Sequence, residues 1–429
     1  MTRRRTTSRR SGHTRRRWVA GAGVIALTAV TAACSNGPEG KVINLYGGAS
    51  DVKFDEIIAS CNKEAAGKYR IVGNLLPSDA DGQREQFVRR LAARDDSLDL
   101  LGMDVTWTAE FAEAGWIREL TGDKAQAATE GVLQPPIDTA MWKDKLYAIP
   151  RTTNVQILWY RKSLVPKAPE TWDQLLEQAQ ALKDEQKPYL ISLTGAQYEG
   201  YVVNITNMLN AYGGTFVNED STKVTLDDKA VQGLGLMKKI ATSGLTSDSL
   251  SNAQEPEVFA DLQSGRAAFA LNWPYVLSAM REANPEVAQD LGYAPFPTVK
   301  AGEPPKVTLG GMNYAISTYS KNPEETYEAA MCLRNEQNQV KAALDAGAAP
   351  VLEKIYTSNA QFREQYPMGD VMLEELKNAV PRPRTPMYQN ISTLVSTNLS
   401  PPSAINPESS TSELRSLIEE TLDGKGILP

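Results

Sequence analysis

Strand-like and helix-like patterns alternate through the first part of the chain. Residues 41–46, 69–76 and 98–103 are rich in apolar and β-branched side chains, and each predicts a strand. Apolar positions at i, i+3, i+4 and i+7 spacing, Phe54, Ile57, Ile58 and Cys61, predict a first helix. A second helix is predicted from about Asp81, with Phe87, Leu91 and Arg94 on one side. This strand–helix alternation is typical of βαβ units, so the predicted fold class is α/β.

The pattern changes after residue 145. Residues 145–150 and 152–160 are extended, and the following stretch, 160–290, is predicted to be mainly helical. A capping box, Thr171-x-x-Gln174, starts the first of its helices. The other helices and the later extended segments are predicted at 198–212, 228–243, 255–263 and 274–283, and at 293–297 and 306–317, with mainly helix from there to 422.

The order of these segments predicts two lobes, each made of more than one stretch of chain. We expect residues 41–150 and 298–350 in an N-terminal α/β lobe, and residues 151–297 and 351–429 in a helix-rich C-terminal lobe. A chain that crosses between lobes more than once forms a hinge, and the cleft between the lobes is the natural place for a ligand.

The first 33 residues have the pattern of an export signal. An arginine-rich stretch is followed by an apolar run, residues 18–33, that ends in small side chains. The run is shorter than the roughly 20 residues that a membrane-spanning helix needs, so we expect cleavage. An uncleaved N-terminal anchor is the alternative.

A lipid attachment site is predicted directly after this run. Ala32-Ala33-Cys34 resembles a bacterial lipobox, whose cysteine carries the lipid after cleavage, although Thr31 stands where Leu is preferred. Residues 34–40 are small and polar, as expected of a tether. Residues 14–19 also resemble a twin-arginine export motif, with Trp and Val in place of the usual Phe and Leu. The expected location is the outer face of the cell membrane, through lipidated Cys34.

Two other cysteines remain, Cys61 and Cys332. In an exported protein two such thiols pair more often than not, so we expect a disulfide that ties the start of the fold to a late helix. Two unrelated buried thiols are the alternative.

Composition excludes several classes of function. The chain has 429 residues, with 45 Lys and Arg against 52 Asp and Glu, and eight of the arginines lie within 1–33. The rest is therefore acidic, which argues against nucleic acid as a partner. The only histidine is His13, so the chain without its leader has no imidazole for a Ser-His-Asp or Cys-His site or a His-ligated metal.

No cofactor or metal is expected. There is no G-x-x-x-x-G-K-[ST] string, and the paired glycines at 47–48, 213–214 and 310–311 lack the rest of a dinucleotide fingerprint. The acidic clusters near 79–81 and 95–96 lack the spacing of an EF-hand.

Several strings resemble the extracellular sugar-binding proteins of ABC importers. They are LYAIP (146–150), LWYR (158–161), PETWDQLL (169–176), SGRAAF (264–269) and APFP (294–297). The resemblance extends over residues 41–422. It implies a periplasmic-binding-protein-like fold, with two lobes joined by a hinge, and a monomer that delivers its ligand to permease subunits and their ATPase.

A narrower resemblance is to trehalose-binding lipoproteins within that family. It is carried by LDLLGMDVTWTAEFAEAGW (98–116), NWPYV (272–276), KVTLGGMN (306–313) and PRPRTPMYQ (381–389). It implies a disaccharide ligand, with trehalose favoured and maltose or another α-linked gluco-oligosaccharide as the alternative.

A sugar site needs carboxylates, amides or arginines for hydroxyl groups and an aromatic ring for the apolar face. Asp104 directly follows the apolar strand 98–103, at a carboxyl end where ligands of α/β sheets bind. Its alternative role is to cap a helix that begins near Thr106. The resemblance favours ligand contact.

Asn154 lies just after Pro150 in a segment predicted to cross between the lobes, so its amide can reach a ligand from the hinge; a turn-forming asparagine is the alternative. Glu255 opens a helix, with Pro256 in the first turn, and can instead complement the helix dipole. The resemblance favours ligand contact by both Asn154 and Glu255.

Three further candidates come from loops and strand ends. Trp273 stands in a proline-containing loop before a helix, where a large aromatic side chain is informative. Gly311 belongs to a glycine pair that ends an extended run, which suggests close approach of the backbone to a ligand. Arg382 is held extended between two prolines, with a surface arginine in a linker as its alternative.

A binding protein is the first functional hypothesis. The second is an exported glycoside hydrolase, which needs two carboxylates about 5–10 Å apart, and Asp104 and Glu255 can supply such a pair. A surface adhesin or sensor partner is the third. We expect no catalytic residues.

Overall fold

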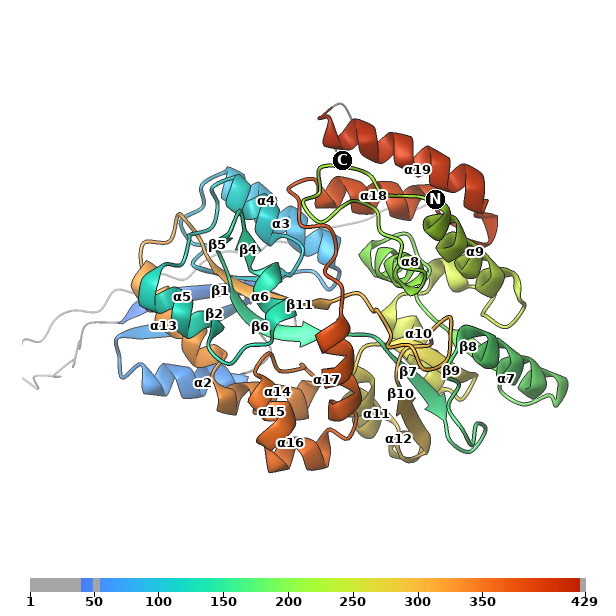
Figure 1. The fold of residues 1–429 in the computed structure, drawn as a ribbon. Coiled ribbons are helices and arrows are strands. Elements are labelled where there is room, and N and C mark those ends of the chain that lie inside the picture. Colours follow the sequence, from blue (N-terminus) through green and yellow to red (C-terminus); the bar gives the residue numbers. More distant parts are fainter. Residues whose placement is uncertain (1–39, 49–54, 425–429) are drawn as a thin grey trace, which may run out of the picture. The chain divides into compact units, whose positions relative to one another are not determined.

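The computed structural model describes residues 40–48 and 55–424 (Figure 1). The predicted signal sequence, Cys34 and the tether up to residue 39 lie outside the described residues. Within the described ranges, no helix has both the length and the apolar character needed to cross a membrane.

The first lobe is built on a five-stranded sheet of order β2-β1-β3-β11-β6. The strands are β1 (Lys41–Gly47), β2 (Tyr69–Leu75), β3 (Leu100–Asp104), β6 (Ile149–Asn154) and β11 (Gly310–Ile316). Strand β1 pairs in parallel with β2 and β3, while β11 runs antiparallel to both β3 and β6. A strand from much later in the chain therefore lies between two early ones.

Helices and a small ribbon complete this lobe. They are α2 (Asp55–Glu64), α3 (Ala80–Ala92), α4 (Thr108–Glu113), α5 (Gly122–Thr129), α6 (Gln134–Thr139), β4 (Met141–Trp142), β5 (Lys145–Leu146), α13 (Pro323–Leu333) and α14 (Glu336–Ala346). Ile57 and Cys61 of α2 and Phe87 and Leu91 of α3 are buried as their spacing predicts, whereas Phe54 lies outside the described residues. Helix α3 ends at Ala92, so Arg94, which was predicted on its side, lies beyond it and is exposed. The carboxylate of Asp79 caps α3 by accepting from the Gly82 N–H at 2.7 Å.

The second lobe has its own four-stranded sheet, of order β10-β7-β9-β8. Its strands are β7 (Ile157–Arg161), β8 (Leu190–Ser192), β9 (Ala267–Asn272) and β10 (Leu291–Ala294). The sequence pattern missed β8 and β9 inside a stretch that was expected to be mainly helical. Every residue of β9 is buried, so its apolar run has no alternation that distinguishes a strand from a buried helix, and β8 has only three residues.

Helices surround this second sheet. They are α7 (Trp172–Asp184), α8 (Glu199–Ala211), α9 (Asp228–Thr242), η1 (Leu250–Asn252), α10 (Glu255–Gln263), α11 (Tyr275–Ala283), α12 (Pro285–Asp290), α15 (Glu353–Ser358), α16 (Ala360–Gln365), α17 (Gly369–Asn378), α18 (Tyr388–Asn398), η2 (Pro402–Ala404) and α19 (Pro407–Leu422). The predicted cap of α7 forms, since Thr171 Oγ1 accepts from the Gln174 N–H, but the Gln174 side chain accepts from Glu170 and not from Thr171.

Two connecting segments pair with each other beside the sheets. Residues 295–309 connect β10 to β11, and residues 379–387 connect α17 to α18. Val380 donates to the Val307 carbonyl at 2.8 Å and accepts from the Leu309 N–H at 2.9 Å. These bonds fix the start of the second segment, which carries Arg382 three residues after its first member. Strand β6 of the first sheet extends to Asn154, four residues beyond the boundary expected after residue 150. The other lobe boundaries given above stay a prediction.

A disulfide joins α2 to α13. Cys61 and Cys332 are bonded across 271 residues of sequence, and Cys61 is part of the apolar core of the first lobe. The bond therefore links the opening βαβ unit to the part of the chain that returns through β11 (Figure 1).

Replacing both cysteines by alanine is expected to lower the free energy of unfolding by about 2–4 kcal/mol, because a cross-link over a long loop restricts the unfolded chain. Chemical denaturation of the double variant beside the oxidised wild type measures this. Equal unfolding midpoints and slopes would contradict the expectation.

Candidate functional site

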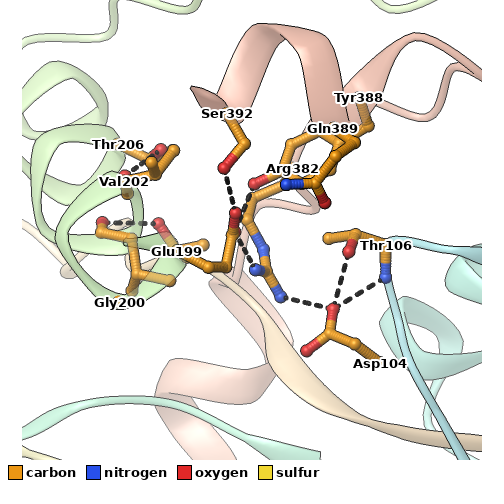
Figure 2. Close-up of polar contacts among 12 residues, drawn as sticks. Asp104, Thr106, Glu199, Gly200, Val202, Thr206, Arg382, Tyr388, Gln389 and Ser392 are labelled. Atoms are coloured by element: carbon orange, nitrogen blue, oxygen red, sulfur yellow. Dashed lines mark hydrogen bonds and ion pairs between the residues drawn. The ribbon is translucent and has the colours of Figure 1, made fainter. Parts of the chain in front are cut away.

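A buried arginine joins elements of both lobes. Arg382 Nη2 donates to Asp104 Oδ1 at 3.2 Å, and Arg382 Nη1 donates to Glu199 Oε1 (Figure 2). Asp104 ends β3 of the first sheet, whereas Glu199 begins α8 of the second lobe. The guanidinium is therefore held by one carboxylate from each side, which makes the surface-linker alternative for Arg382 wrong.

The Glu199 carboxylate is the most enclosed acidic group of this network. Besides Arg382 it accepts hydrogen bonds from the Tyr388 and Ser392 hydroxyl groups of α18 (Figure 2). Burial raises the pKa of Glu199 above its ordinary value, and the nearby charge of Arg382 opposes that rise. Sequence reasoning missed Glu199, because a glutamate in the first helical turn is also what the helix dipole favours.

The charge of Arg382 is maintained by its partners. Burial alone would lower the pKa of the guanidinium, but Asp104, Tyr388 and Glu199 outweigh that effect and raise the pKa. Arg382 Nε has no hydrogen-bond partner among the described residues, so one donor of the planar group is left over.

Asp104 faces the arginine because a local turn orients it. Its Oδ1 accepts from the Thr106 N–H at 2.9 Å and from the Thr106 hydroxyl at 2.7 Å. Helix α4 begins only at Thr108, and its N-cap position is held by Trp107 with no capping hydrogen bond. Asp104 is therefore not a helix cap, and the same oxygen that forms the turn also contacts Arg382.

Glu255 forms a second polar group at the start of α10. The Tyr198 hydroxyl donates to Glu255 Oε2 at 2.5 Å, and Trp273 Nε1 donates to Oε1 at 3.3 Å. Capping is done by its neighbour Glu257, whose carboxylate accepts from the Gln254 N–H at 3.0 Å. The Glu255 side chain is thus directed to an aromatic pair and is not used to cap the helix.

The Trp273 indole also reaches the first sheet. A Cβ placed on Gly310 of β11 would lie 3.0 Å from Trp273 Cζ3 and Cη2, and 3.5 Å from the Cβ of Asn154. Asn154 pairs with Gly310 in the β6–β11 register, and its Oδ1 is buried with no partner in the part of the chain that the structure describes. The structure therefore brings together Asn154 and Trp273, two of the predicted site residues.

Gly311 has a reason to be glycine that does not involve a ligand. Its φ is +135°, and a Cβ there would lie 2.4 Å from the Thr152 carbonyl oxygen on the neighbouring strand. Ligand contact by Gly311 stays a prediction. The neighbouring Gly310 is the glycine that makes room for the indole.

A further contact between the lobes was not predicted. Gln389 Nε2 of α18 donates to Asp81 Oδ1 of α3 at 2.9 Å, and burial raises the pKa of Asp81. Asp81 lies in the first turn of α3, where the sequence offers the helix dipole as a sufficient reason for a carboxylate. The sequence around Asp81 therefore does not distinguish a buried contact from an exposed carboxylate at a helix start.

These polar groups contact one another closely. The cavity beside Arg382, lined by Thr106, Ala109, Thr139 and Met141 among others, has about 10 Å³, close to the space of one water. A larger hollow of about 700 Å³ lies elsewhere, between α8, α9 and residues 296–306. We place the candidate site at the convergent charged and aromatic side chains, where a ligand must displace or join existing hydrogen bonds.

The chemistry of the site suits neutral polar ligands. Its carboxylates already face a guanidinium, hydroxyl groups or an indole N–H, and each carboxylate oxygen has more than one lone pair. Within residues 40–48 and 55–424, no group of three or more His, Cys, Asp or Glu side chains could hold a metal ion.

Replacing Arg382 by glutamine is expected to lower the free energy of unfolding by about 3–5 kcal/mol, because Asp104 and Glu199 would then be buried without a compensating charge. Arg384→Gln is the matched control, since Arg384 lies in the same segment and donates to a neutral group, the Asp138 carbonyl, at 3.3 Å. Denaturant unfolding compares the two. Equal losses in both variants would show that the ion pairs are not the cause.

Comparison with known proteins agrees with this architecture. A solved structure of maltose-bound MalE3 from T. maritima superposes with a TM-score of 0.80 and 25% identity, covering 88% of this chain and 99% of that one. The predicted α/β fold with two lobes, of the periplasmic-binding-protein type, is thereby confirmed.

Related sequences identify the family. A probable ABC transporter-binding protein of Deinococcus radiodurans is 27% identical over 352 residues, which cover 77% of this chain and 81% of that protein. A galactooligosaccharide-binding protein of Bacillus subtilis is 22% identical over 265 residues, or 59% and 60% of the two chains. The family model for bacterial extracellular solute-binding proteins matches residues 70–345, so this chain belongs to the bacterial extracellular solute-binding proteins.

Proposed function

We propose that this protein is the sugar-binding component of an ABC importer. The observation that carries the proposal is the convergence of sugar-compatible groups from both lobes: Asp104 and Asn154 from one, Glu255 and Trp273 from the other, and Arg382 joined to both sides. Relatives named as binders of maltose and galactooligosaccharides support this ligand class. The relatives are binding proteins, which is consistent with a protein that is not an enzyme.

Binding would use contacts that span the two lobes. A sugar hydroxyl group can accept from Arg382 while donating to Asp104 or Glu255, and the indole of Trp273 can cover an apolar ring face. A ligand that bonds to both lobes at once favours the arrangement in which they are close, so ligand binding and lobe closure are coupled.

Trehalose is the ligand we favour. The support is the resemblance of the strings around Asp104, Trp273, Gly311 and Arg382 to the trehalose-binding lipoprotein LpqY. Trehalose is non-reducing and nearly two-fold symmetric, so we expect polar groups of the site to bind it at both ends. Maltose is the second candidate, supported by the maltose-bound T. maritima relative.

Delivery requires partners that the chain does not contain. We propose that permease subunits and their ATPase receive the sugar, and that a lipid on Cys34 holds the protein at the outer face of the membrane. Membership of an extracellular family implies an extracytoplasmic location. Mass spectrometry of the membrane-bound form tests the lipid, and an unmodified residue 34 would contradict the anchor.

Calorimetric titration of residues 35–429 with trehalose is expected to show saturable binding that maltose and glucose do not reproduce. Recovery of intact trehalose after long incubation separates a binding protein from a glycoside hydrolase. Binding of maltose alone would keep the importer and reject trehalose. Binding of neither sugar would contradict the proposed function.

Replacing Glu255 by glutamine is expected to weaken sugar binding by about 10- to 100-fold, because a hydrogen bond to a charged group contributes about 1.5–3 kcal/mol. Glu257→Gln is the control, since this residue lies on the same helix, is exposed and accepts from the Gln254 N–H at the start of α10. Titration calorimetry gives both dissociation constants. A similar loss in the two variants would argue against a ligand role for Glu255.

A further inference from the structure

We infer that Tyr198 positions the Glu255 carboxylate, and through it the Trp273 indole, for the sugar. Tyr198 is outside every motif that suggested the function, and its role here is to orient another residue. The inference rests on the proposed function, since it names what holds two of the proposed sugar contacts in place.

The three side chains form one hydrogen-bonded chain. Tyr198 donates to one carboxylate oxygen of Glu255 at 2.5 Å, and Trp273 Nε1 donates to the other at 3.3 Å. With a donor on each oxygen, rotation of the carboxylate about its last bond breaks both hydrogen bonds. Its orientation is therefore fixed before a ligand arrives, which is how a preorganised site reduces the cost of binding.

The backbone of Glu255 is fixed from the same side. Its carbonyl oxygen accepts from Asn272 Nδ2 and from the Tyr275 hydroxyl, both at 3.2 Å, and Asn272 Oδ1 accepts from the Trp273 N–H at 2.8 Å. The main chain of Glu255 is thus already tied to the loop that carries Trp273. Tyr198, by contrast, comes from another part of the lobe, the N-terminus of α8.

Tyr198 occupies a position where its residue type is unusual. It is the N-cap of α8, with extended backbone angles, and it makes no side-chain capping hydrogen bond. Ser, Thr, Asp and Asn are favoured there because they accept from the first helical N–H groups, and losing such a cap costs about 1 kcal/mol. A local rule broken in this way is expected where a side chain serves a site.

The first turn of α8 is shaped to let the phenol ring reach Glu255. A Cβ on Gly200 would lie 2.1 Å from the Tyr198 hydroxyl oxygen and 2.8 Å from Glu255 Oε1. Any larger residue at 200 would displace both atoms, so the glycine makes room for this hydrogen bond. The adjacent residue is Glu199, so one turn of helix serves both Arg382 and Glu255.

The phenol remains a donor over the whole physiological range. Burial, followed by the charge of Glu255, raises the pKa of Tyr198 above its ordinary value. At its other edge the Trp273 indole rests against Gly310 of the first sheet. Tyr198 therefore acts at the beginning of a chain of contacts that ends on the opposite lobe.

The test is Tyr198→Phe in the mature protein, which removes the hydroxyl group and keeps the ring. Tyr201→Phe is the matched control, because Tyr201 is on the same helix and its buried hydroxyl donates to the Leu399 carbonyl at 2.8 Å, away from Glu255. Two quantities are measured: the dissociation constants for trehalose and maltose, and the ¹⁵N–¹H resonance of the Trp273 indole, assigned with Trp273→Phe.

We expect Tyr198→Phe to weaken sugar binding about tenfold and to move the Trp273 indole resonance in the ligand-free protein. Tyr201→Phe should lower stability with affinity and resonance unchanged. Adding Tyr198→Phe to Glu255→Gln should weaken binding by less than about twofold beyond Glu255→Gln alone, because the two residues act through one carboxylate.

Two results would overturn the inference: an unmoved indole resonance in Tyr198→Phe, or a full tenfold effect of Tyr198→Phe in the Glu255→Gln background, which would make Tyr198 a separate contact. If the wild type binds neither sugar, the proposed function fails, and the resonance alone decides the positioning role. If Tyr198→Phe does not fold, Glu255→Gln must move the same resonance for the inference to stand.

Discussion

The structure depends on one buried charge being neutralised from two directions. Arg382 is enclosed, and a guanidinium removed from water is tolerated only where carboxylates and hydrogen bonds replace the lost hydration. Asp104 and Glu199 supply that replacement from different lobes. Neither lobe offers both carboxylates, so the charge of the arginine is balanced from two sides only when elements of both lobes lie around it.

Several features of the backbone make this pairing possible. The bonds of Val380 to Val307 and Leu309 place the segment that carries Arg382. The turn at Thr106 directs Asp104 toward the arginine, and the first turn of α8 presents Glu199 with its neighbour Tyr198. Tyr198 contacts Glu255, and its neighbour Glu199 contacts Arg382. The start of α8 therefore joins the charged part of the site to the aromatic part.

This arrangement has a consequence for how a sugar is recognised. The carboxylates of the site already accept hydrogen bonds from neighbouring side chains, while Arg382 Nε and Asn154 Oδ1 have no partner among the described residues. At the carboxylates a ligand therefore gains only the difference between its own hydrogen bonds and those that it replaces. Selectivity then comes from matching the fixed directions of the carboxylates and the indole. An ill-matched sugar leaves a buried charged group without a partner, which is the costly outcome.

The sequence by itself determined the α/β class, the positions of α2, α3 and α7 to α11, and the first three strands, because apolar spacing reports directly on burial. It also singled out Asp104, Asn154, Glu255, Trp273 and Arg382, which the structure gathers in two connected groups. It missed β9 and the roles of Tyr198, Glu199 and Asp81. Strand β9 is buried along its whole length, so its sequence has no alternation of apolar and polar residues. Glu199 and Asp81 lie in first helical turns, where the helix dipole alone is a sufficient reason for a carboxylate. Only the tertiary structure, which brings residues 199 and 382 together, decides that Glu199 faces a buried cation, since local spacing contains no information about a partner so far along the chain.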